Sequence, residues 1–265
     1  MLQFEGLAGD CNIFHFITTR HGGVSKGNYA SFNLGAYCGD QPENVRENRK
    51  RLCGALGITP SFLFVPHQTH DTQIRVIDNS FLAADKETQT NALEGIDALI
   101  TATPGACIAV TTADCVPIIL YDPKKQVIAA IHAGWRGTAN NITTQTVETM
   151  THCFHVDPAD ILAGIAPSIG QKAFEVGQEV ADAFSLTGID TTSICCYNKE
   201  SGKPHIDLAE ANRRQLIKCG VNPENIESSG ICTHTGNADF YSARQSGIHS
   251  GRFLTGILLT PKTTV

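Results

Sequence analysis

One stretch of this chain constrains the fold more than any other: two apolar runs that flank a short segment of turn residues. Val116–Tyr121 and Gln126–Ile131 are rich in β-branched and other apolar side chains, and Asp122–Lys125 lies between them with an aspartate and a proline. This pattern predicts a β-hairpin. Because the strands of a hairpin are antiparallel, the sheet that contains it must be at least partly antiparallel.

The predicted hairpin has a polar residue at each of its outer ends. If the turn is centred between Pro123 and Lys124, Cys115 and His132 face each other across the two strands. Directly opposed residues have Cβ atoms about 4.5–5.5 Å apart, which is close enough for a thiolate and an imidazole to bind one metal ion. We therefore predict that Cys115 and His132 are two ligands of a metal site.

The rest of the chain alternates apolar strands with helices. Helices are predicted between Asp40 and Gly57 and over about residues 138–154, 174–184 and 207–219. Further strands are predicted over about residues 73–77, 98–101, 107–112, 161–165 and 253–259. Several of them are apolar throughout, as expected for a sheet that is covered on both faces. The pattern predicts an α/β fold of the α+β sandwich type, with a mixed, partly antiparallel sheet and packed helices, in a single domain over residues 1–265.

Charge and hydropathy argue against two kinds of partner. The formal net charge is −6 and the Lys and Arg residues are dispersed, so there is no basic stripe of the kind that nucleic acids bind. No run of 18 apolar residues occurs and the first residues lack a signal-peptide pattern. We expect a soluble cytoplasmic protein that binds neither nucleic acid nor membrane; its oligomeric state is not predicted.

The cysteines do not form a disulfide framework. There are ten of them in 265 residues, and none forms a C-x-x-C pair. We expect most to be reduced and buried, with Cys11, Cys53, Cys107, Cys153 and Cys219 acting as small apolar residues.

A catalytic zinc site takes three protein ligands and leaves one position open, so the predicted pair needs a third residue. The segment His67-Gln-Thr-His70 is the richest source. Residues three apart on a strand face opposite ways, so only one of the two histidines would be a ligand. The spacing alone does not choose between His67 and His70, and either could be an ordinary hydrogen-bonded histidine.

Two further residues near the predicted site could take part in chemistry. Asp114 is a candidate general base or a residue that orients another group, and equally a strand-end cap. Arg136 follows His132 in a Gly-Trp-Arg-Gly setting, where it could bind phosphate or form a structural ion pair.

A series of motifs, in order from about residue 15 to residue 257, resembles the laccase-domain, or YfiH-like, family. They are Thr19-Arg-His-Gly-Gly-Val-Ser25, Phe32-Asn-Leu-Gly35, Asn48-Arg49, Gln68-Thr-His70, Thr112-Ala-Asp-Cys-Val-Pro117, His132-Ala-Gly-Trp-Arg-Gly-Thr138, Ile165-Ala-Pro-Ser-Ile-Gly170, Asp207-Leu-Ala-Glu-Ala-Asn212 and Phe240-Tyr-Ser-Ala-Arg244.

The resemblance implies a zinc ion held by His70, Cys115 and His132, which selects His70 over His67. It also implies phosphorolysis of purine nucleosides such as adenosine, inosine or guanosine, and deamination of adenosine. Purine nucleoside and phosphate are then the expected partners. Asp114, Cys115 and His132 are the expected catalytic residues.

Phosphorolysis needs cationic groups that hold phosphate. We expect Arg49, Arg136 and Arg244 to supply them, with Asn33 as a further substrate-binding residue.

Three other functions stay open. The family has also been described as a polyphenol oxidase, but multicopper oxidases use many histidines, commonly in H-x-H pairs, and this chain has no such pair; copper would be a substitute for zinc. A hydrolase that uses Cys115 as nucleophile and His132 as base would suit a role in peptidoglycan editing. A binding module with structural zinc is the non-enzymatic alternative, although the wide spacing of the ligands favours an open site.

Overall fold

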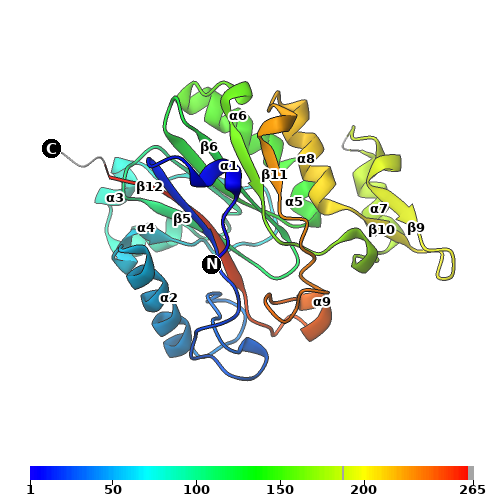
Figure 1. Cartoon of the computed structure of the whole chain (residues 1–265), viewed down its shortest axis with the longest axis horizontal. Helices are drawn as coiled ribbons and strands as arrows, with labels where there is room; N and C mark the ends of the chain where they lie inside the picture. Colours follow the sequence, from blue (N-terminus) through cyan, green and yellow to red (C-terminus); the bar gives the residue numbers. More distant parts are fainter. Residues whose placement is uncertain (187, 262–265) are drawn as a thin grey trace.

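Two β-sheets lie at the centre of the molecule with helices on their outer sides (Figure 1). The structure is a computed structural model that describes residues 1–186 and 188–261. The four-stranded sheet has the order β1 (Ile13–Ile17), β12 (Phe253–Leu259), β5 (Cys107–Thr112) and β2 (Leu63–Phe64). The six-stranded sheet has the order β11 (Ile226–Ser228), β8 (Leu162–Ile165), β6 (Val116–Asp122), β7 (Val127–Ala133), β4 (Ala98–Thr101) and β3 (Ile74–Val76). Each sheet contains parallel and antiparallel pairs, so the predicted mixed α/β sandwich is confirmed, with its strands divided between two sheets.

The central strands are buried on both faces. In β7, Ile128 and Ala130 belong to the core between the sheets, whereas Ala129 and Ile131 pack on the opposite side with residues of α6 (Ile142–Phe154) and α8 (Leu208–Lys218). On the outer side of the other sheet, Leu52 of α2 (Pro42–Leu56) packs near Phe16. Because neither face meets water, these strands are apolar along their whole length and do not alternate.

The hairpin is present, but its register differs from the prediction. Asp122 pairs with Val127, so the turn spans residues 123–126 and its centre lies one residue later than predicted, between Lys124 and Lys125. The Asp122 carboxylate accepts hydrogen bonds from the backbone N–H of Lys124 and Lys125 at 2.7 and 3.1 Å. These bonds stabilise a four-residue turn, and Gln126 closes it with φ of +54°. The expected direct pairing of Cys115 with His132 is therefore wrong, because His132 pairs with Pro117.

Two of the predicted helices agree closely with the structure, and two differ. Gly57 ends α2 in the left-handed conformation, and the Asp207 side chain caps α8 by accepting the N–H of Glu210. The helix expected over residues 138–154 is instead α5 (Trp135–Ala139) followed by α6, because Asn141 interrupts it with φ of +61°. The helix expected from residue 174 begins only at α7 (Gln178–Ser185).

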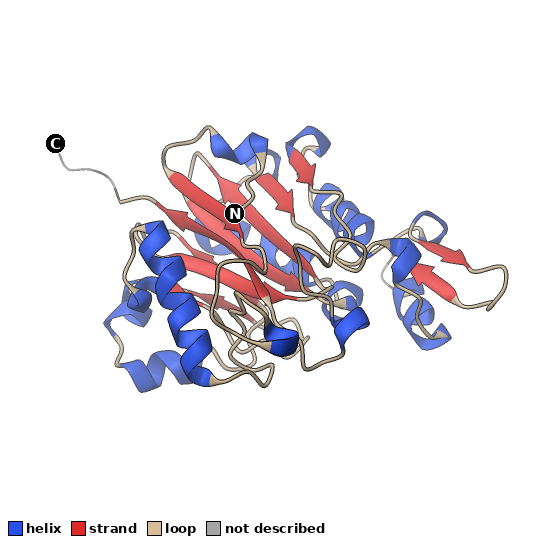
Figure 2. Cartoon of the chain, turned by 60° about the horizontal axis from the view of Figure 1, so that its bottom comes forward, coloured by secondary structure: helices blue, strands red, loops and turns tan. Residues whose placement is uncertain are grey.

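A small hairpin projects from one end of the molecule next to α7 (Figure 2). It consists of β9 (Cys195–Tyr197) and β10 (Pro204–Ile206). The other short helices are α1 (Glu5–Ala8), α3 (Asn79–Ala83), α4 (Lys86–Ala92) and α9 (Ala243–Ser246). Single 3₁₀ turns occupy Gly27–Tyr29, Pro60–Phe62, Pro158–Asp160, Gln171–Ala173, Thr191–Ser193 and Pro223–Asn225. Within the described ranges, no helix has the length and apolar character needed to span a membrane.

All ten cysteines are free, as expected. Cys53 and Cys107 are buried and Cys219 is half-buried, but Cys11 and Cys153 are exposed. Burial was wrongly predicted for these two because Cys11 lies in a turn and Cys153 lies on the outward side of α6 near its end.

Candidate metal centre and its cavity

Three residues from separate parts of the chain bring their ligand atoms together. The candidate ligand atoms of His70, Cys115 and His132 all lie within 4.8 Å of one another. His70 lies in the loop between β2 and β3, Cys115 lies in the bend just before β6, and His132 lies on β7. Two imidazoles and one thiolate form a zinc donor set that leaves a fourth position for another ligand.

Cys115 reaches His132 although the two residues are not paired in the ladder. Cys115 lies two residues before Pro117, the ladder partner of His132, and so is a diagonal neighbour of His132. Long side chains can meet across such a diagonal. Asp114 has φ of +96°, which bends the chain at this point.

Asp97 holds two of the three ligands in place. Its carboxylate accepts the Nδ1–H of His132 at 2.7 Å, which leaves Nε2 of that histidine available to a metal ion. It also accepts the backbone N–H of Thr69, His70 and Asp71 at 3.3, 3.1 and 2.9 Å, and so fixes the turn in which His70 has φ of +64°. Asp97 is not among the residues expected from the sequence, although a single acidic residue directly before an apolar strand is a usable signal.

The centre favours charge separation when no metal is bound. Burial alone would raise the pKa of Cys115. The neighbouring His132 and His70 have the larger combined effect and lower this pKa to about 6. Burial lowers the pKa of His132, but Cys115 and Asp97 raise it to about 9. Between these values the metal-free protein holds a thiolate beside an imidazolium, so Cys115 is already in the form that binds zinc.

Gly134 leaves the space that the ligands occupy. A Cβ atom at this position would lie 3.0 Å from Cδ2 of His70 and 3.2 Å from Sγ of Cys115. Any side chain would therefore press on two ligands at once. Together with the donor set and the carboxylate behind His132, this close approach fits a bound zinc ion. We call His70, Asp97, Cys115, His132 and Gly134 the metal floor.

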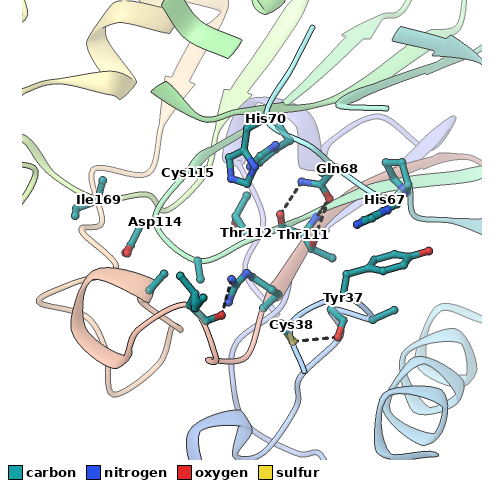
Figure 3. Close-up of a pocket in the computed structure, with 18 of the residues that line it drawn as sticks. Tyr37, Cys38, His67, Gln68, His70, Thr111, Thr112, Asp114, Cys115 and Ile169 are labelled. Carbon is teal, nitrogen blue, oxygen red and sulfur yellow. Dashed lines mark hydrogen bonds between the residues drawn. The ribbon is translucent and has the colours of Figure 1, made fainter. Parts of the chain in front are cut away.

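The metal floor opens into a cavity of about 550 Å³ (Figure 3). Its walls come from segments that are far apart in the sequence, including residues 35–38, 66–70, 111–115 and 243–244. Gln68 fixes one of these segments to β5. Its Oε1 accepts the backbone N–H of Thr111 at 2.8 Å, and its Nε2 donates to the backbone carbonyl of the same residue at 2.9 Å.

Two of the predicted phosphate-binding arginines line the cavity. Arg49 donates through Nε to the Leu34 carbonyl at 3.0 Å, and no acidic side chain forms an ion pair with it within the described residues. Burial lowers the pKa of this guanidinium. Arg244 donates from one terminal nitrogen to the Ala173 carbonyl at 3.1 Å and lies over the ring of Phe174.

Asp114 also lines the cavity, but both of its carboxylate oxygens have donors. Oδ1 accepts the hydroxyl of Thr233 at 2.7 Å, and Oδ2 accepts the backbone N–H of Arg244 at 2.6 Å. Asp114 thus ties the chain that carries Arg244 to the bend that carries Cys115.

Arg136 and Asn33 do not line this cavity. Arg136 is exposed, with its guanidinium 4.2 Å from the centre of the Trp135 ring. Asn33 is fully buried; its amide donates to Asp40 at 2.9 Å and accepts the backbone N–H of Arg252 at 2.8 Å. In this conformation Asn33 supports the loop behind the cavity.

His67 belongs to the cavity, but not to the metal floor. Its ring stacks on Tyr37 with a centroid distance of 3.7 Å, and its Nδ1 bonds the carboxylate of Glu94 at 2.5 Å. Tyr37 is 61 % exposed. We call Tyr37, His67 and Glu94 the cavity rim.

The fold and the floor together define an α/β protein with a candidate three-ligand metal centre, in which His132 is buried, Cys115 is half-buried and His70 is exposed, at the base of a cavity. Residues 14–260 match the family described as "Multi-copper polyphenol oxidoreductase laccase". The chain belongs to this family, which includes proteins named YfiH, so the family resemblance is confirmed.

Several relatives carry the names of purine enzymes. A protein of Bacteroides thetaiotaomicron named "Purine nucleoside phosphorylase" is 46 % identical over 98 % of this chain and 96 % of its own length. "Adenosine deaminase RL5", from an unknown prokaryotic organism, is 43 % identical over 91 % of this chain and 92 % of its own length. The crystal structure of YlmD from Geobacillus stearothermophilus superposes with a TM-score of 0.88 at 33 % identity, covering 95 % of this chain and 93 % of that one.

Proposed function

We propose that this protein is a zinc-dependent purine nucleoside phosphorylase. It would cleave adenosine, inosine or guanosine with phosphate to the free base and ribose 1-phosphate. The observation that carries the proposal is the combination of a candidate three-ligand centre with a cavity-lining Arg49 for which the described part of the chain provides no acidic partner. The names of the relatives support the same reaction class.

His70, Cys115 and His132 would hold the zinc, which supplies Lewis-acid activation of an oxygen nucleophile when bound. Arg49 and Arg244 would bind phosphate, because guanidinium groups donate to its oxygens in pairs. Asp114 would keep Arg244 in position through its bond to the backbone N–H. Arg136 and Asn33 would contact substrate only in a conformation that brings them into the cavity, because neither lines it in the present one.

Deamination of adenosine is the second candidate reaction. It is favoured by the relative that is named an adenosine deaminase and is 43 % identical. Both reactions need an activated oxygen nucleophile, so one metal centre could serve either, with the orientation of the nucleoside deciding which atom is attacked.

Phenol oxidation has less support as the native activity. Within the described residues, His70, Cys115 and His132 make up the single group of three or more candidate ligands, whereas a multicopper oxidase needs several metal ions. Copper(II) binds nitrogen and sulfur sites more tightly than zinc does, so copper would be expected to replace zinc and give a side activity.

A cysteine hydrolase would use the same thiolate in a different way. Cys115 and His132 form an activated pair in the metal-free protein. A free nucleophile would react with iodoacetamide in the purified protein, whereas a zinc-bound thiolate would react mainly after chelation. Rapid alkylation of Cys115 in the zinc-loaded protein would favour the hydrolase.

Product analysis of the zinc-loaded protein with adenosine tests the proposed function. We expect adenine to be released only when phosphate is present, and this activity to be lost in His70→Ala. Inosine formation without phosphate would indicate deamination instead. No conversion of any purine nucleoside would overturn both reactions.

The phosphate site can be tested separately by a pair of arginine variants. Arg49→Met should raise the KM for phosphate by roughly 10- to 100-fold, because a bond between charged groups contributes about 1.5–3 kcal/mol. Arg46→Met is the matched control, since Arg46 lies on the same helix as Arg49 but is exposed and lies outside the cavity. Equal effects of the two substitutions would contradict the assignment of Arg49.

A further inference from the structure

A cluster of buried polar side chains joins three helices, α5, α6 and α8, outside the cavity. Thr138, Thr143 and Asn212 have exposed fractions of 0 %, and Gln215 is 1 % exposed. Burial of a polar side chain costs free energy unless hydrogen bonds compensate for it, and apolar side chains at these positions would avoid that cost. Asn212 also ends the sequence motif over residues 207–212, which the proposed function does not use.

Asn212 uses both ends of its amide group within this cluster. Its Nδ2 donates to Oγ1 of Thr138 at 3.0 Å and to the Leu208 carbonyl at 2.8 Å. Its Oδ1 accepts the hydroxyl of Thr143 at 2.7 Å. Since Thr138 belongs to α5 and Thr143 to α6, the single amide of Asn212 connects α8 to both of the other helices.

Gln215, one turn further along α8, binds the same residue of α5. Its Nε2 donates to the backbone carbonyl of Thr138 at 2.7 Å. The last carbonyls of a helix have no partner within the helix, and α5 has five residues, which is too short for a helix that is stable by itself. The position of α5 therefore depends on its contacts with the rest of the protein, and both amides of α8 act on Thr138 (Figure 1).

The other side of α5 adjoins the metal floor. Gly134 is the N-cap of this helix, and Trp135 lines the cavity. A Cβ atom at Gly137 would lie 3.2 Å from the carbonyl oxygen of Asp71, so the backbone of α5 lies directly against the loop that carries His70. A shift of α5 would consequently move the cavity wall and the backbone that contacts the candidate ligands.

We propose that Asn212 is a positioning residue of the metal floor. It holds α5 through Thr138, and α5 in turn fixes Gly134 against the candidate ligands and Trp135 in the cavity wall. Asn212 does not line the cavity itself, so it acts only through α5. The inference rests on the metal site of the proposed function and adds to that site a residue of a separate helix.

The fluorescence of Trp135 tests this position without metal or substrate, because Trp135 is the single tryptophan of the chain. Asn212→Leu keeps a side chain of similar size and removes its hydrogen bonds. In the metal-free variant we expect the emission maximum to differ from that of the native protein and acrylamide to quench Trp135 more strongly. Competition with a chelator should show a zinc affinity about three- to tenfold lower, below the usual effect of losing a partner bonded directly to a ligand.

Gln215→Met is a second variant, which is needed because Asn212→Leu could fail to fold. Within the described residues Oε1 of Gln215 has no partner, so this substitution removes only the bond to the Thr138 carbonyl and nearly preserves the shape of the side chain. We expect the Trp135 emission and the zinc affinity to change in the same direction as in Asn212→Leu.

Met150→Ala controls for a general loss of stability. Met150 is also 0 % exposed, but it lies eight residues beyond the start of α6, about 12 Å along the helix. This variant should unfold at a lower temperature than the native protein and keep the native Trp135 emission and zinc affinity.

Two results would overturn the inference. One is native emission, or native zinc affinity, in both Asn212→Leu and Gln215→Met. The other is a loss of zinc affinity in Met150→Ala as large as theirs. A native protein that binds no zinc would overturn the proposed function instead, and the emission of the metal-free variants would then decide whether Asn212 positions α5. The two failures are therefore distinguishable.

Discussion

The metal floor and the cavity rim belong to one cavity, but only the floor contains a pair of residues that neighbouring strands place side by side. In the floor, Asp97 and His132 are buried, with exposed fractions of 0 % and 3 %, and the ladder places them side by side because β4 pairs with β7. In the rim, Tyr37 and Glu94 are exposed and come from loops. The comparison indicates that strand pairing fixes Asp97 against His132, and that the Asp97 carboxylate then fixes the loop that carries His70, whereas no strand pair holds Tyr37 and Glu94.

Removal of a floor ligand should have the largest effect. His132→Ala takes away one of three ligands and leaves Asp97 buried without its partner, so we expect loss of bound zinc and of nucleoside turnover. Metal analysis of the purified variant and a product assay would check this. Full zinc content in His132→Ala would show that the floor is not the metal site.

Asp97→Asn should weaken zinc binding by about 10- to 100-fold, the usual effect of losing a carboxylate behind a histidine ligand. Competition with a chromophoric chelator would measure the affinity. Glu94→Gln, the corresponding change in the rim, should leave the zinc affinity unchanged. A similar loss in both variants would remove the distinction between floor and rim.

Gly134→Ala should weaken zinc binding by roughly tenfold, because overpacking costs about 1–3 kcal/mol and the new methyl group meets His70 and Cys115. The backbone itself accepts alanine, since φ is −69°. Thermal unfolding of the metal-free variant should therefore be little changed. A large loss of stability without metal would mean that Gly134 is needed for the fold instead.

The metal-free floor should show a pH-dependent thiol. With a pKa of about 6, the thiolate fraction of Cys115 increases about tenfold from pH 5 to pH 7, and its alkylation rate should increase in proportion. Mass spectrometry of the peptide that contains Cys115 would follow the reaction. Cys107 is an internal control, because burial raises its pKa and keeps it unreactive. A rate that begins to rise only above pH 8 would contradict the ion pair.

The smallest effect is expected at the rim. Tyr37→Ala should raise the KM for nucleoside about three- to tenfold, because an aromatic pair contributes about 0.5–1.5 kcal/mol. Zinc content and kcat should stay as in the native protein. Steady-state kinetics would separate the two parameters, and a fall in kcat alone would assign Tyr37 to the chemistry rather than to recognition.

The same contrast explains which parts of the site the sequence could predict. The hairpin could be predicted because its apolar runs are continuous, but its register depends on hydrogen bonds that two turn amides donate to Asp122, which the pattern does not reveal. His70 could not be separated from His67 by spacing, because His70 lies in a left-handed turn and not on a strand. Asp97 and His132 become neighbours only when β4 and β7 pair, and the two residues are 35 positions apart.

Arg136 shows the limit of arguments from motif composition. The glycines on either side suggested close approach to a ligand, but α5 begins at Trp135 and its first turn leaves Arg136 exposed against that indole ring. Arg49, by contrast, was predicted within a helix far from the hairpin, and α2 brings it to the cavity.

The place of β12 in the four-stranded sheet has a consequence for biosynthesis. This strand lies between β1 and β5, although it is the last of the described strands to leave the ribosome. Until it arrives, β1 and β5 have no partner on their facing edges, so a nascent chain cannot complete this layer or the cavity wall that adjoins it. A chain that ends before Phe253 would lack a central strand of this sheet. We expect such a chain to remain incompletely folded and to be degraded by proteases.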